Sequence, residues 1–205
     1  MKVGPVYATN GSVVPVTPDF RKLYSQPTAL ALLGRLIGDE AKRQRVRILA
    51  GLETCGIPLA AAASLASRLP MVYLRKKPHA GWSKSIVDGA YRRGARTALV
   101  DDAITFGGQK VEFIRKLRGE LKPVAILTIW DSSYSSRYRK VLLTKDLAVR
   151  SLVTKLEVMA YMLQHKLMQS DTYEVMLAQT KNPLHWHEDA KFWRLMGKVK
   201  RRGTL

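Results

Sequence analysis

The chain has 205 residues, 46% of them hydrophobic and 25% charged, which is enough for one domain with a sizeable core or for a domain with a helical appendage. This composition excludes collagen, a disulfide scaffold and a wholly disordered chain. Thirty-five Lys and Arg against sixteen Asp and Glu give a net charge of +19, which predicts an anionic partner. Nucleic acid, a membrane surface and a phosphorylated small molecule all fit that charge.

The sequence also indicates the cellular compartment of the protein. Cys55 is the single cysteine, so no internal disulfide can form and nothing points to an oxidising compartment. No apolar run approaches the roughly 20 residues of a membrane span, and the N-terminus lacks the apolar stretch of a signal peptide. We expect a soluble, cytoplasmic protein.

The elements follow from the hydrophobic pattern in chain order. Val13 to Val16, set among prolines, predicts a short edge strand or a hairpin, and residues 28–42 have the pattern of an amphipathic helix. Beyond these, short apolar runs alternate with helical patterns. We expect strands at 47–50, 71–74, 97–100 and 124–130, helices at 58–69 and 109–118, and a long polar stretch at 75–94.

Continuous apolar strands separated by helices are typical of a parallel sheet covered on both faces. The sequence therefore predicts an α/β fold, a Rossmann-like and mainly parallel sheet flanked by helices. After Asp146 the pattern turns helical, and from Lys191 onward we expect a frayed basic tail. The expected division is a hood segment at 1–27, an α/β core at 28–145 and a helical C-terminal extension at 146–205.

The segment 98–110 (ALVDDAITFGGQK) carries the most specific motif. An apolar strand runs into Asp101 and Asp102, then into Thr105, a glycine pair and the start of a helix. Unpaired N–H groups and the positive end of the dipole at a helix N-terminus bind phosphate, and glycines let the backbone approach it. Carboxylates at the strand end accept hydrogen bonds from a vicinal diol. Together they favour a sugar phosphate, and the alternative is an ordinary strand-to-helix turn with an acidic cap.

Two further segments have a related form. Residues 50–58 (AGLETCGIP) give another strand, tight loop and helix start, although Gly51 and Gly56 alone are also ordinary turn residues. Residues 75–85 (RKKPHAGWSKS) form a basic loop whose length is typical of a lid and whose cations suit a polyphosphate. A solvated basic face is the alternative for this loop.

In this order and spacing, the three segments resemble a type I phosphoribosyltransferase, and within that family the orotate branch. The stretch from Asp101 to Gln109 is similar to the signature for phosphoribosyl pyrophosphate, and Gly51 to Ala60 is similar to the pyrophosphate loop of the orotate branch. Tyr73 to Pro78 resembles that branch's basic strand end, and Gly11 to Leu23 its hood segment. The resemblance covers about residues 7–131.

The resemblance implies a glycosyltransferase, more narrowly a pentosyltransferase, that moves ribose 5-phosphate from phosphoribosyl pyrophosphate to orotate, a step of pyrimidine nucleotide synthesis. Pyrophosphate leaves C1 of the ribose, positive charge develops on the ring, and a base nitrogen attacks the opposite face. It further implies a magnesium ion held mainly by the substrate, with no protein metal ligand, and a homodimer whose lid residues cross into the neighbouring site.

The family's roles can be transferred position by position. Asp101 and Asp102 would accept the ribose hydroxyls, and the lid and its approach would supply the catalytic groups Lys76, Lys84 and His79, acting together with Asp102. The loop around the 5′-phosphate would comprise Ala103, Ile104, Thr105, Phe106, Gly107, Gly108 and Gln109. The pyrophosphate would be held by Gly51, Leu52, Glu53, Thr54, Cys55 and Gly56, assisted by Arg75 and Lys76.

The sequence departs from the family pattern where an orotate enzyme contacts its base. Thr9 stands where the hood has a lysine, and the strand after the signature ends in Asp131 and Ser132 instead of Asp-Arg. In the lid, His79 aligns with a family lysine and the lid histidine has no match, although Lys84 could serve. Loss of basic groups opposes tight binding of the orotate carboxylate unless Arg137 or Arg139 replaces them.

Alternatives therefore stay open at this point. The chain could transfer phosphoribosyl to another base such as a purine, uracil or nicotinate, serve as a nucleic-acid-binding regulator on the same fold, or persist as an inactive scaffold. In the C-terminal region the aromatic and methionine side chains favour packing over a cofactor site. His185 and His187 with Glu188 could form a metal cluster, but histidines two residues apart face different sides of a strand or helix and no third ligand is evident.

Overall fold

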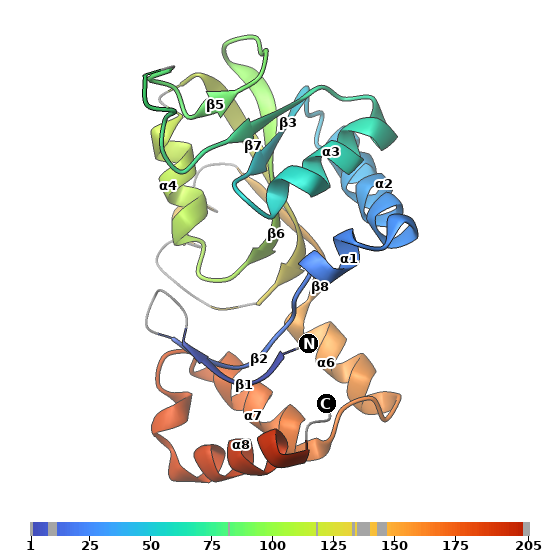
Figure 1. The fold of residues 1–205 in the computed structure, drawn as a ribbon, viewed down its shortest axis with the longest axis vertical. Helices are drawn as coiled ribbons and strands as arrows, with labels where there is room; N and C mark the ends of the chain where they lie inside the picture. Colours follow the sequence, from blue (N-terminus) through green and yellow to red (C-terminus); the bar gives the residue numbers. More distant parts are fainter. Residues whose placement is uncertain are drawn as a thin grey trace. The chain divides into compact units, whose positions relative to one another are not determined.

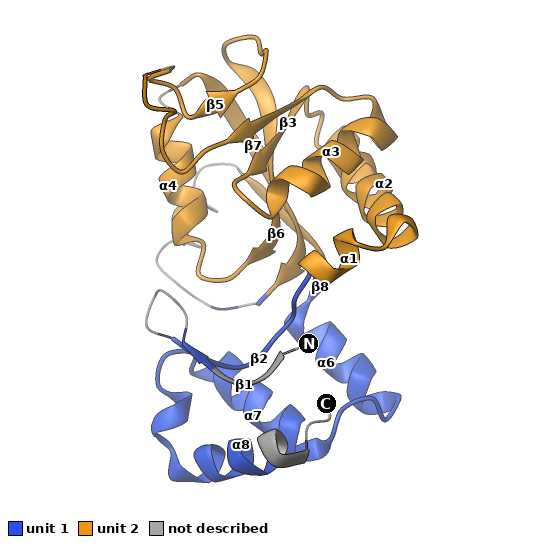
Figure 2. Ribbon diagram, in the orientation of Figure 1, with its two compact units in different colours: residues 1–20, 132–134, 153–205 blue, residues 21–131, 135–152 orange. Residues whose placement is uncertain are grey.

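The structure is a computed structural model of the chain. It describes residues 2–7, 12–81, 83–117, 119–132, 134, 140–142 and 147–202. The described chain divides into two compact units, shown in different colours in Figure 2. The first comprises residues 1–20, 132–134 and 153–205, and the second residues 21–131 and 135–152. One unit thus combines the N-terminal strands with the C-terminal helices, two segments that the sequence analysis treats separately.

The second unit is built on the six-stranded sheet of Figure 1, with the strand order β5-β4-β3-β6-β7-β8. β3 pairs in parallel with β4 and β6, and β6 with β7, whereas β5 is antiparallel to β4. This confirms the predicted mainly parallel α/β sheet. Its strands are β3 (Ile48–Leu52), β4 (Met71–Leu74), β5 (Val87–Asp88), β6 (Ala95–Ile104), β7 (Leu121–Asp131) and β8 (Ala148–Thr154), of which the last two residues count with the first unit. Its helices are α1 (Arg21–Tyr24), α2 (Pro27–Arg43), α3 (Gly56–Ser67) and α4 (Gly108–Lys116).

Small residues let two of these helices pack closely. α2 lies against α3 at Gly34 and Gly38, where an added Cβ would come within 2.7 Å of Ala62 and 2.9 Å of Ser67. The α2–α3 pair and α4 lie on opposite sides of the sheet (Figure 1). Between them the strands are buried, as the fully buried β3 shows. This is why these strands have continuous apolar runs without alternation.

One predicted element is wrong. Residues 148–154, expected to begin a helical region, form β8 at the edge of the sheet. The β-branched side chains of Val149, Val153 and Thr154 favour a strand, and the true helix start is marked by a capping box. In that box Thr154 Oγ1 accepts from the backbone N–H of Glu157, and the Glu157 carboxylate accepts from the backbone N–H of Thr154.

The first unit contains an antiparallel hairpin, as the sequence allows, and helices that pack on it. Val13 packs with Val175, Trp186 and Met196, and the indole of Trp186 donates to the Val13 carbonyl at 2.7 Å. The expectation that aromatic side chains of the C-terminal region serve packing is thus confirmed for Trp186. The elements are β1 (Lys2–Tyr7), β2 (Val13–Thr17), α6 (Lys155–Gln164), α7 (Ser170–Lys181), a 3-10 turn (Trp186–Glu188) and α8 (Ala190–Arg202).

The expected frayed tail is instead a helix. α8 runs from Ala190 to Arg202 and buries Met196, because the apolar side chains at Phe192, Leu195 and Met196 lie on one side of it. A basic stretch with apolar residues at helical spacing folds when that side is covered. Among the described residues, no helix combines the length and the apolar character needed to cross a bilayer.

Candidate active site

Two loops of the second unit meet at the carboxyl ends of neighbouring strands. The loop after β3 leads into α3 at Gly56, and the loop after β6 leads into α4 at Gly108. Because β3 and β6 are adjacent and parallel, both loops emerge at the same edge of the sheet, where open α/β sheets bind ligands. The predicted phosphate and pyrophosphate loops are therefore neighbours.

Gly56 makes this approach possible. A Cβ built on Gly56 would lie 2.0 Å from the Val100 carbonyl oxygen and 3.2 Å from the Asp101 Cα. Gly51 is nearly as restricted, since its Cβ would lie 2.9 Å from the Gly56 carbonyl oxygen. The two glycines act by their lack of a side chain, which lets the loop around Thr54 lie directly on β6. The peptide between Glu53 and Thr54 is cis, and Thr54 is exposed while Leu52 is buried.

The second loop has the form of an anion site. Gly107 is the N-cap of α4 and has φ +86°, a conformation in which glycine is favoured. Behind it Ile104 is fully buried, whereas Thr105 and Gln109 are exposed and Ala103, Phe106 and Gly108 are half-buried. The strand end is thus fixed in the core while the polar residues of the loop face solvent.

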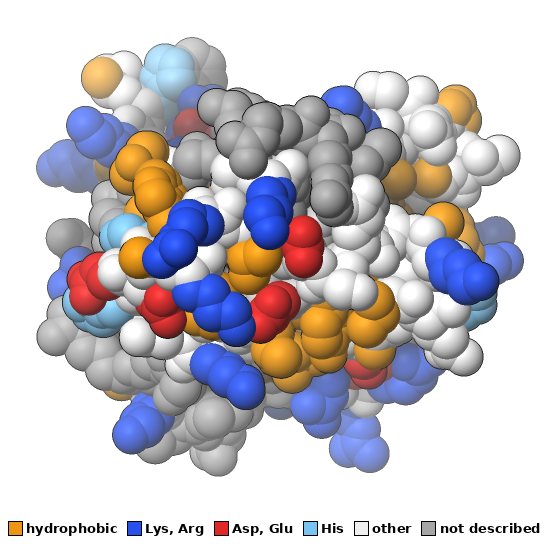
Figure 3. Space-filling model, turned by 90° about the horizontal axis from the view of Figure 1, so that it is seen from below, with side chains coloured by type: hydrophobic (Ala, Val, Ile, Leu, Met, Phe, Trp, Pro, Cys, Tyr) orange, Lys and Arg blue, Asp and Glu red, His pale blue; other side chains and the backbone are white. Residues whose placement is uncertain are grey.

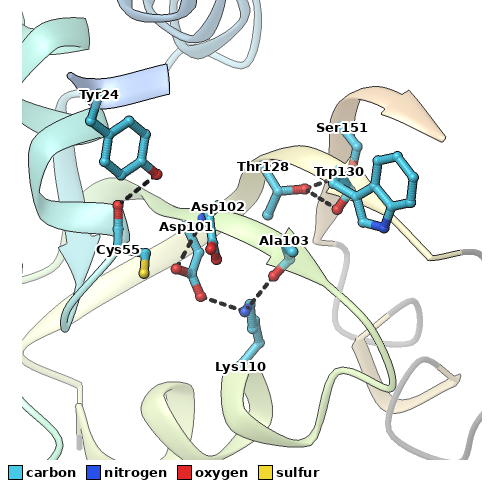
Figure 4. A network of polar contacts seen from close by, with 9 residues as sticks. All are labelled: Tyr24, Cys55, Asp101, Asp102, Ala103, Lys110, Thr128, Trp130 and Ser151. Atoms are coloured by element: carbon cyan, nitrogen blue, oxygen red, sulfur yellow. Dashed lines mark hydrogen bonds and ion pairs between the residues drawn. The ribbon is translucent and has the colours of Figure 1, made fainter. Parts of the chain in front are cut away.

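A buried lysine holds the first of the two carboxylates, as Figure 4 shows. Lys110 Nζ lies 2.5 Å from Asp101 Oδ2 and donates to the Ala103 carbonyl at 2.7 Å. The two charged side chains are only 6% and 8% exposed. The other oxygen of Asp101 accepts from the backbone N–H of Asp102 at 3.0 Å. Both oxygens of Asp101 therefore already have partners within the protein.

Asp102 is the carboxylate left to meet a ligand. It is half-buried, and burial together with the adjacent charge of Asp101 raises its pKa. The Cys55 thiol faces it, and burial followed by the charges of Asp102 and Asp101 raises the thiol pKa to about 11. Cys55 is therefore a neutral thiol at physiological pH. Its carbonyl accepts a hydrogen bond from the Tyr24 hydroxyl at 3.0 Å (Figure 4).

The start of the predicted lid is bonded to the first loop and to the last residue of α4. The Glu53 carboxylate accepts from the backbone N–H of Lys76 at 2.8 Å, and Lys116 of α4 donates to the Lys76 carbonyl at 2.8 Å. The Arg75 guanidinium is engaged with Asp88 and holds the pKa of that carboxyl below its usual range. Arg75 thus reaches a pyrophosphate only by leaving Asp88. The Lys76 side chain is exposed and free of this restraint.

The two ends of the predicted lid lie next to each other. The backbone N–H of Arg75 donates to the Ile86 carbonyl at 2.8 Å, so residues 76–85 project from one point of the sheet edge. His79 and Lys84, which the sequence analysis assigns to catalysis, both lie in this projecting loop and are exposed. Gly81 has φ +77° at its tip. The structure places these two residues in the lid without bringing them against Asp102.

The residues proposed to contact the base have a different outcome. Thr9, Arg137 and Arg139 lie outside the described residues. Ser132 is 5% exposed, and its side chain is hydrogen-bonded to Tyr134 within the first unit. Their roles stay predictions.

The sequence analysis missed Lys110 and Tyr24. Lys110 occupies an inward position of α4, one helical spacing before Phe113 and two before Leu117, where an apolar residue is expected. A lysine on the buried side of a helix that follows two carboxylates is a signal for an internal ion pair. Tyr24 carries no comparable signal, because it is brought to Cys55 by the packing of α1.

Two glycine-containing loops at neighbouring carboxyl ends of a parallel sheet, with a carboxylate beside the N-terminus of a helix, are the arrangement of type I phosphoribosyltransferases. Solved structures share this fold. The UMP synthase of Leishmania donovani matches with a TM-score of 0.75 at 23% identity, over 89% of this chain and 39% of that one. The orotate phosphoribosyltransferase of Aeropyrum pernix matches with a TM-score of 0.67 at 22% identity, over 79% and 92%.

Sequence comparison narrows the class. The orotate phosphoribosyltransferase of Roseobacter denitrificans is 30% identical over 194 residues, which cover 91% of this chain and 85% of the relative. That of Methanocaldococcus jannaschii is 30% identical over 100 residues, and here the match covers 49% of this chain and about half (56%) of the relative. No family model matches. The chain belongs to the orotate phosphoribosyltransferase family.

Proposed function

We propose that the chain transfers ribose 5-phosphate from phosphoribosyl pyrophosphate to orotate and releases pyrophosphate, a pentosyltransferase step of pyrimidine nucleotide synthesis. The observation that carries this proposal is the contact of Gly56 with β6 at Val100, which puts the two anion loops side by side next to Asp102. The names of the relatives support orotate as the acceptor. A related structure from Mycobacterium tuberculosis, with a TM-score of 0.57, was solved with phosphoribosyl pyrophosphate bound.

In this proposal each loop has one task. Asp102 accepts the ribose hydroxyls, since Asp101 is already held by Lys110 and acts by fixing the strand end. The amides after Thr105 bind the 5′-phosphate at the start of α4, and the loop from Gly51 to Gly56 binds the pyrophosphate. The Tyr24 hydroxyl donates to the Cys55 carbonyl, and in this proposal it thereby keeps that carbonyl oxygen turned away from the pyrophosphate.

The reaction needs positioning and charge more than covalent participation. As pyrophosphate leaves C1, positive charge develops on the ribose and negative charge on the departing oxygens. Lys76 is an exposed cation whose backbone N–H is bonded to Glu53 of the first loop, and Lys84 and His79 arrive with the lid. Lid closure excludes water, which would otherwise compete with the base as nucleophile.

A magnesium ion fits the donor set as a partner of the substrate. Of the two carboxylates, Asp101 is neutralised by Lys110, and within the described ranges no three His, Cys, Asp or Glu side chains gather as metal ligands. We therefore assign the ion to the pyrophosphate and hydroxyl oxygens of the substrate. When bound, magnesium offsets part of the pyrophosphate charge.

The decisive experiment measures pyrophosphate release from phosphoribosyl pyrophosphate and magnesium, with orotate, uracil, adenine, guanine, hypoxanthine or nicotinate supplied in turn. We expect release with orotate. Release with another base alone would move the chain to a different transferase, an outcome to which Ser132 points because it stands where the family pattern has arginine. Donor binding without release for any base would refute transfer.

The site assignment has its own test and a matched control. Asp102→Asn should lower turnover by about 100-fold or more, since removing one partner of developing charge typically costs that much. Asp39→Asn removes the same charge at an exposed position of α2 and should leave turnover unchanged. Equal turnover of the two variants would reject the role of Asp102. We also propose a homodimer, which light scattering of the purified protein would test.

A further inference from the structure

A row of arginines lies at the amino-terminal ends of the central strands, whereas the candidate active site lies at their carboxyl ends. It belongs to four short segments, 44–47, 68–70, 92–96 and 119–122, which lie just before or at the first residues of β3, β4, β6 and β7. We call this surface the arginine edge. Its seven cationic side chains are all exposed: Arg45, Arg47, Arg68, Arg92, Arg93, Arg96 and Lys122.

Backbone hydrogen bonds place these segments next to one another. The N–H of Arg47 donates to the Arg96 carbonyl at 2.8 Å, and the N–H of Leu49 donates to the Pro70 carbonyl at 2.9 Å. Arg96 stands opposite Lys122 in the register of β6 and β7. Neighbouring strands are about 4.8 Å apart, so the row from β4 to β7 spans roughly 14 Å.

The charge of this edge is not balanced locally. Glu120 is the one acidic residue in the four segments, and its carboxylate accepts hydrogen bonds from the hydroxyls of Ser85 and Tyr91. Within the part of the chain that the structure describes, no ion pair joins the seven cations to a carboxylate. Arg96 donates to the carbonyls of Arg45 and Gln44, both at 3.1 Å, which fixes its guanidinium at the edge.

The arginine edge is separate from the chemistry at the other end of the strands. From Arg96 to Asp102 along β6 is six residues, or about 20 Å. At 0.1 M ionic strength charges further apart than about 10 Å are largely screened from one another. The row is therefore too far away to act on the ribose or the pyrophosphate of the proposed substrate. Its density of positive charge suits a different anionic ligand.

The charges of the first unit are arranged differently. On the face of the first unit drawn in Figure 3, basic side chains lie close to acidic ones. In that unit Lys191 of α8 pairs with Glu174 of α7 at 2.6 Å. Val46 and Leu121, two apolar side chains of the arginine edge, are buried, so the edge offers mainly charge and little of the apolar surface that membrane anchoring needs.

We propose that the arginine edge binds the phosphodiester backbone of nucleic acid without sequence preference. Six of its seven cations are arginines, whose planar fork pairs with phosphate oxygens in a bidentate manner. A strand of nucleic acid carries a phosphate about every 3.4 Å along a duplex, so a row of roughly 14 Å faces about four of them. No base-reading groups are required for this mode, since phosphate contacts carry no sequence information.

The test is fluorescence anisotropy of the full chain with labelled 20-nucleotide single-stranded RNA and with a 20-base-pair duplex, between 50 and 200 mM KCl. The variant R47Q/R92Q/R93Q removes three guanidiniums that make no side-chain hydrogen bond among those the structure describes. We expect affinity at 100 mM KCl to fall about tenfold or more. The slope of log affinity against log salt should fall by about 2 for single strands.

The control variant R35Q/K181Q/K198Q lowers the net charge by the same amount at exposed positions elsewhere. It should keep nearly all of the affinity, and both variants should keep the wild-type melting temperature and the rate of pyrophosphate release. Equal losses in the two variants would show a response to net charge alone and overturn the proposal. Undetectable binding by the wild type at 50 mM KCl would also overturn it, as would tighter, edge-dependent binding to phosphatidylserine vesicles.

Discussion

Lys110 gives the two adjacent carboxylates at the end of β6 different environments. Asp101 is buried in an ion pair, whereas Asp102 is half-buried and has a raised pKa because of burial and the charge of Asp101. Two adjacent carboxylates without a cation would favour sharing a proton. The lysine therefore keeps a charge on the strand end and leaves Asp102 without an ion pair, as its proposed role of substrate acceptor requires.

Lys110→Met should be strongly destabilising, because it leaves Asp101 buried without its counter-ion. Breaking a buried ion pair from one side typically costs about 3–5 kcal/mol. In the protein that remains folded, the proton affinity of the carboxylate pair rises, so the acidic limb of the pH profile of kcat/KM should move to higher pH. Urea denaturation and the pH profile measure the two effects.

The double variant Asp101→Asn/Lys110→Met separates the ion pair from simple packing. Removing both charges should restore much of the stability that the single variant loses, because no unpaired charge remains. A double variant as unstable as Lys110→Met would show that the lysine acts through its shape instead of its charge.

Gly56→Ala tests the contact that joins the two loops. The new Cβ would meet the Val100 carbonyl oxygen at 2.0 Å, so α3 or β6 must move. We expect loss of donor binding in calorimetric titration with phosphoribosyl pyrophosphate, together with a lower melting temperature. Gly94→Ala adds the same methyl group where no atom lies within 4 Å, and there only the strain of its φ of +75° applies. Unimpaired donor binding by Gly56→Ala would contradict the proposed geometry.

At the scale of elements, α6 begins with a buried lysine that has no carboxylate partner in the contacts described. Lys155 Nζ donates to the Met176 carbonyl at 3.0 Å and to the Gln179 side chain, and it lies 5.4 Å from the ring centre of Tyr134. Burial lowers its pKa to about 7. The lysine joins α6 to α7 through hydrogen bonds that a neutral amine can also make.

This pKa predicts how stability depends on pH. Between about pH 7 and the ordinary lysine value near 10.5, the unfolded chain binds a proton that the folded chain does not. Unfolding free energy therefore rises with pH in this window, by at most about 1.4 kcal/mol per unit. The destabilisation is complete below pH 7 and disappears toward pH 10.5. Denaturation of wild type and Lys155→Met from pH 7 to 9.5 measures the difference.

Lys155→Met serves as the control, because every other group that titrates in this pH range contributes equally to the wild type and to the variant. Relative to Lys155→Met, the wild type should gain stability steadily as pH rises. A constant difference between the two would show that Lys155 is charged in the folded protein throughout.

The elements also show what the sequence could predict. β3, β4 and α2 were found within a residue or two, because their apolar runs and helical spacing are unmixed. β8 was missed because three leucines suggested a helix while the β-branched residues that favour a strand lie between them. The helical form of α8 was missed because its apolar residues gain stability only when the neighbouring helix and β2 cover them.

For the site, the sequence motifs located both loops. The close approach of backbone segments there requires glycines, and glycines at a fixed spacing are visible in the local sequence. They could not find Tyr24, which reaches the Cys55 carbonyl from 31 residues away. Nor could they show that Arg75 is engaged with Asp88, a partner from β5. Such contacts depend on tertiary packing.

At the scale of the whole molecule, the net charge of +19 bears on how the proposed substrate reaches the site. Phosphoribosyl pyrophosphate is a strongly negative ligand, and a basic protein raises its encounter rate at low ionic strength. Lys76, Lys77 and Lys84 are exposed cations of the lid, whose first residues are bonded to the Glu53 loop. Their field falls off over about 10 Å at 0.1 M salt.

We therefore expect kcat/KM for phosphoribosyl pyrophosphate to fall severalfold as KCl is raised from 20 to 200 mM, while kcat changes little. Salt screens the approach of the donor, whereas the enclosed transition state is screened much less. The lid variant Lys77→Gln/Lys84→Gln, which removes two positive charges, should flatten this salt dependence. R35Q/K181Q/K198Q removes three positive charges outside the lid and should not. A kcat/KM that stays flat with salt in the wild type would mean that the lid charges act only after the donor is bound, as contacts in the closed state.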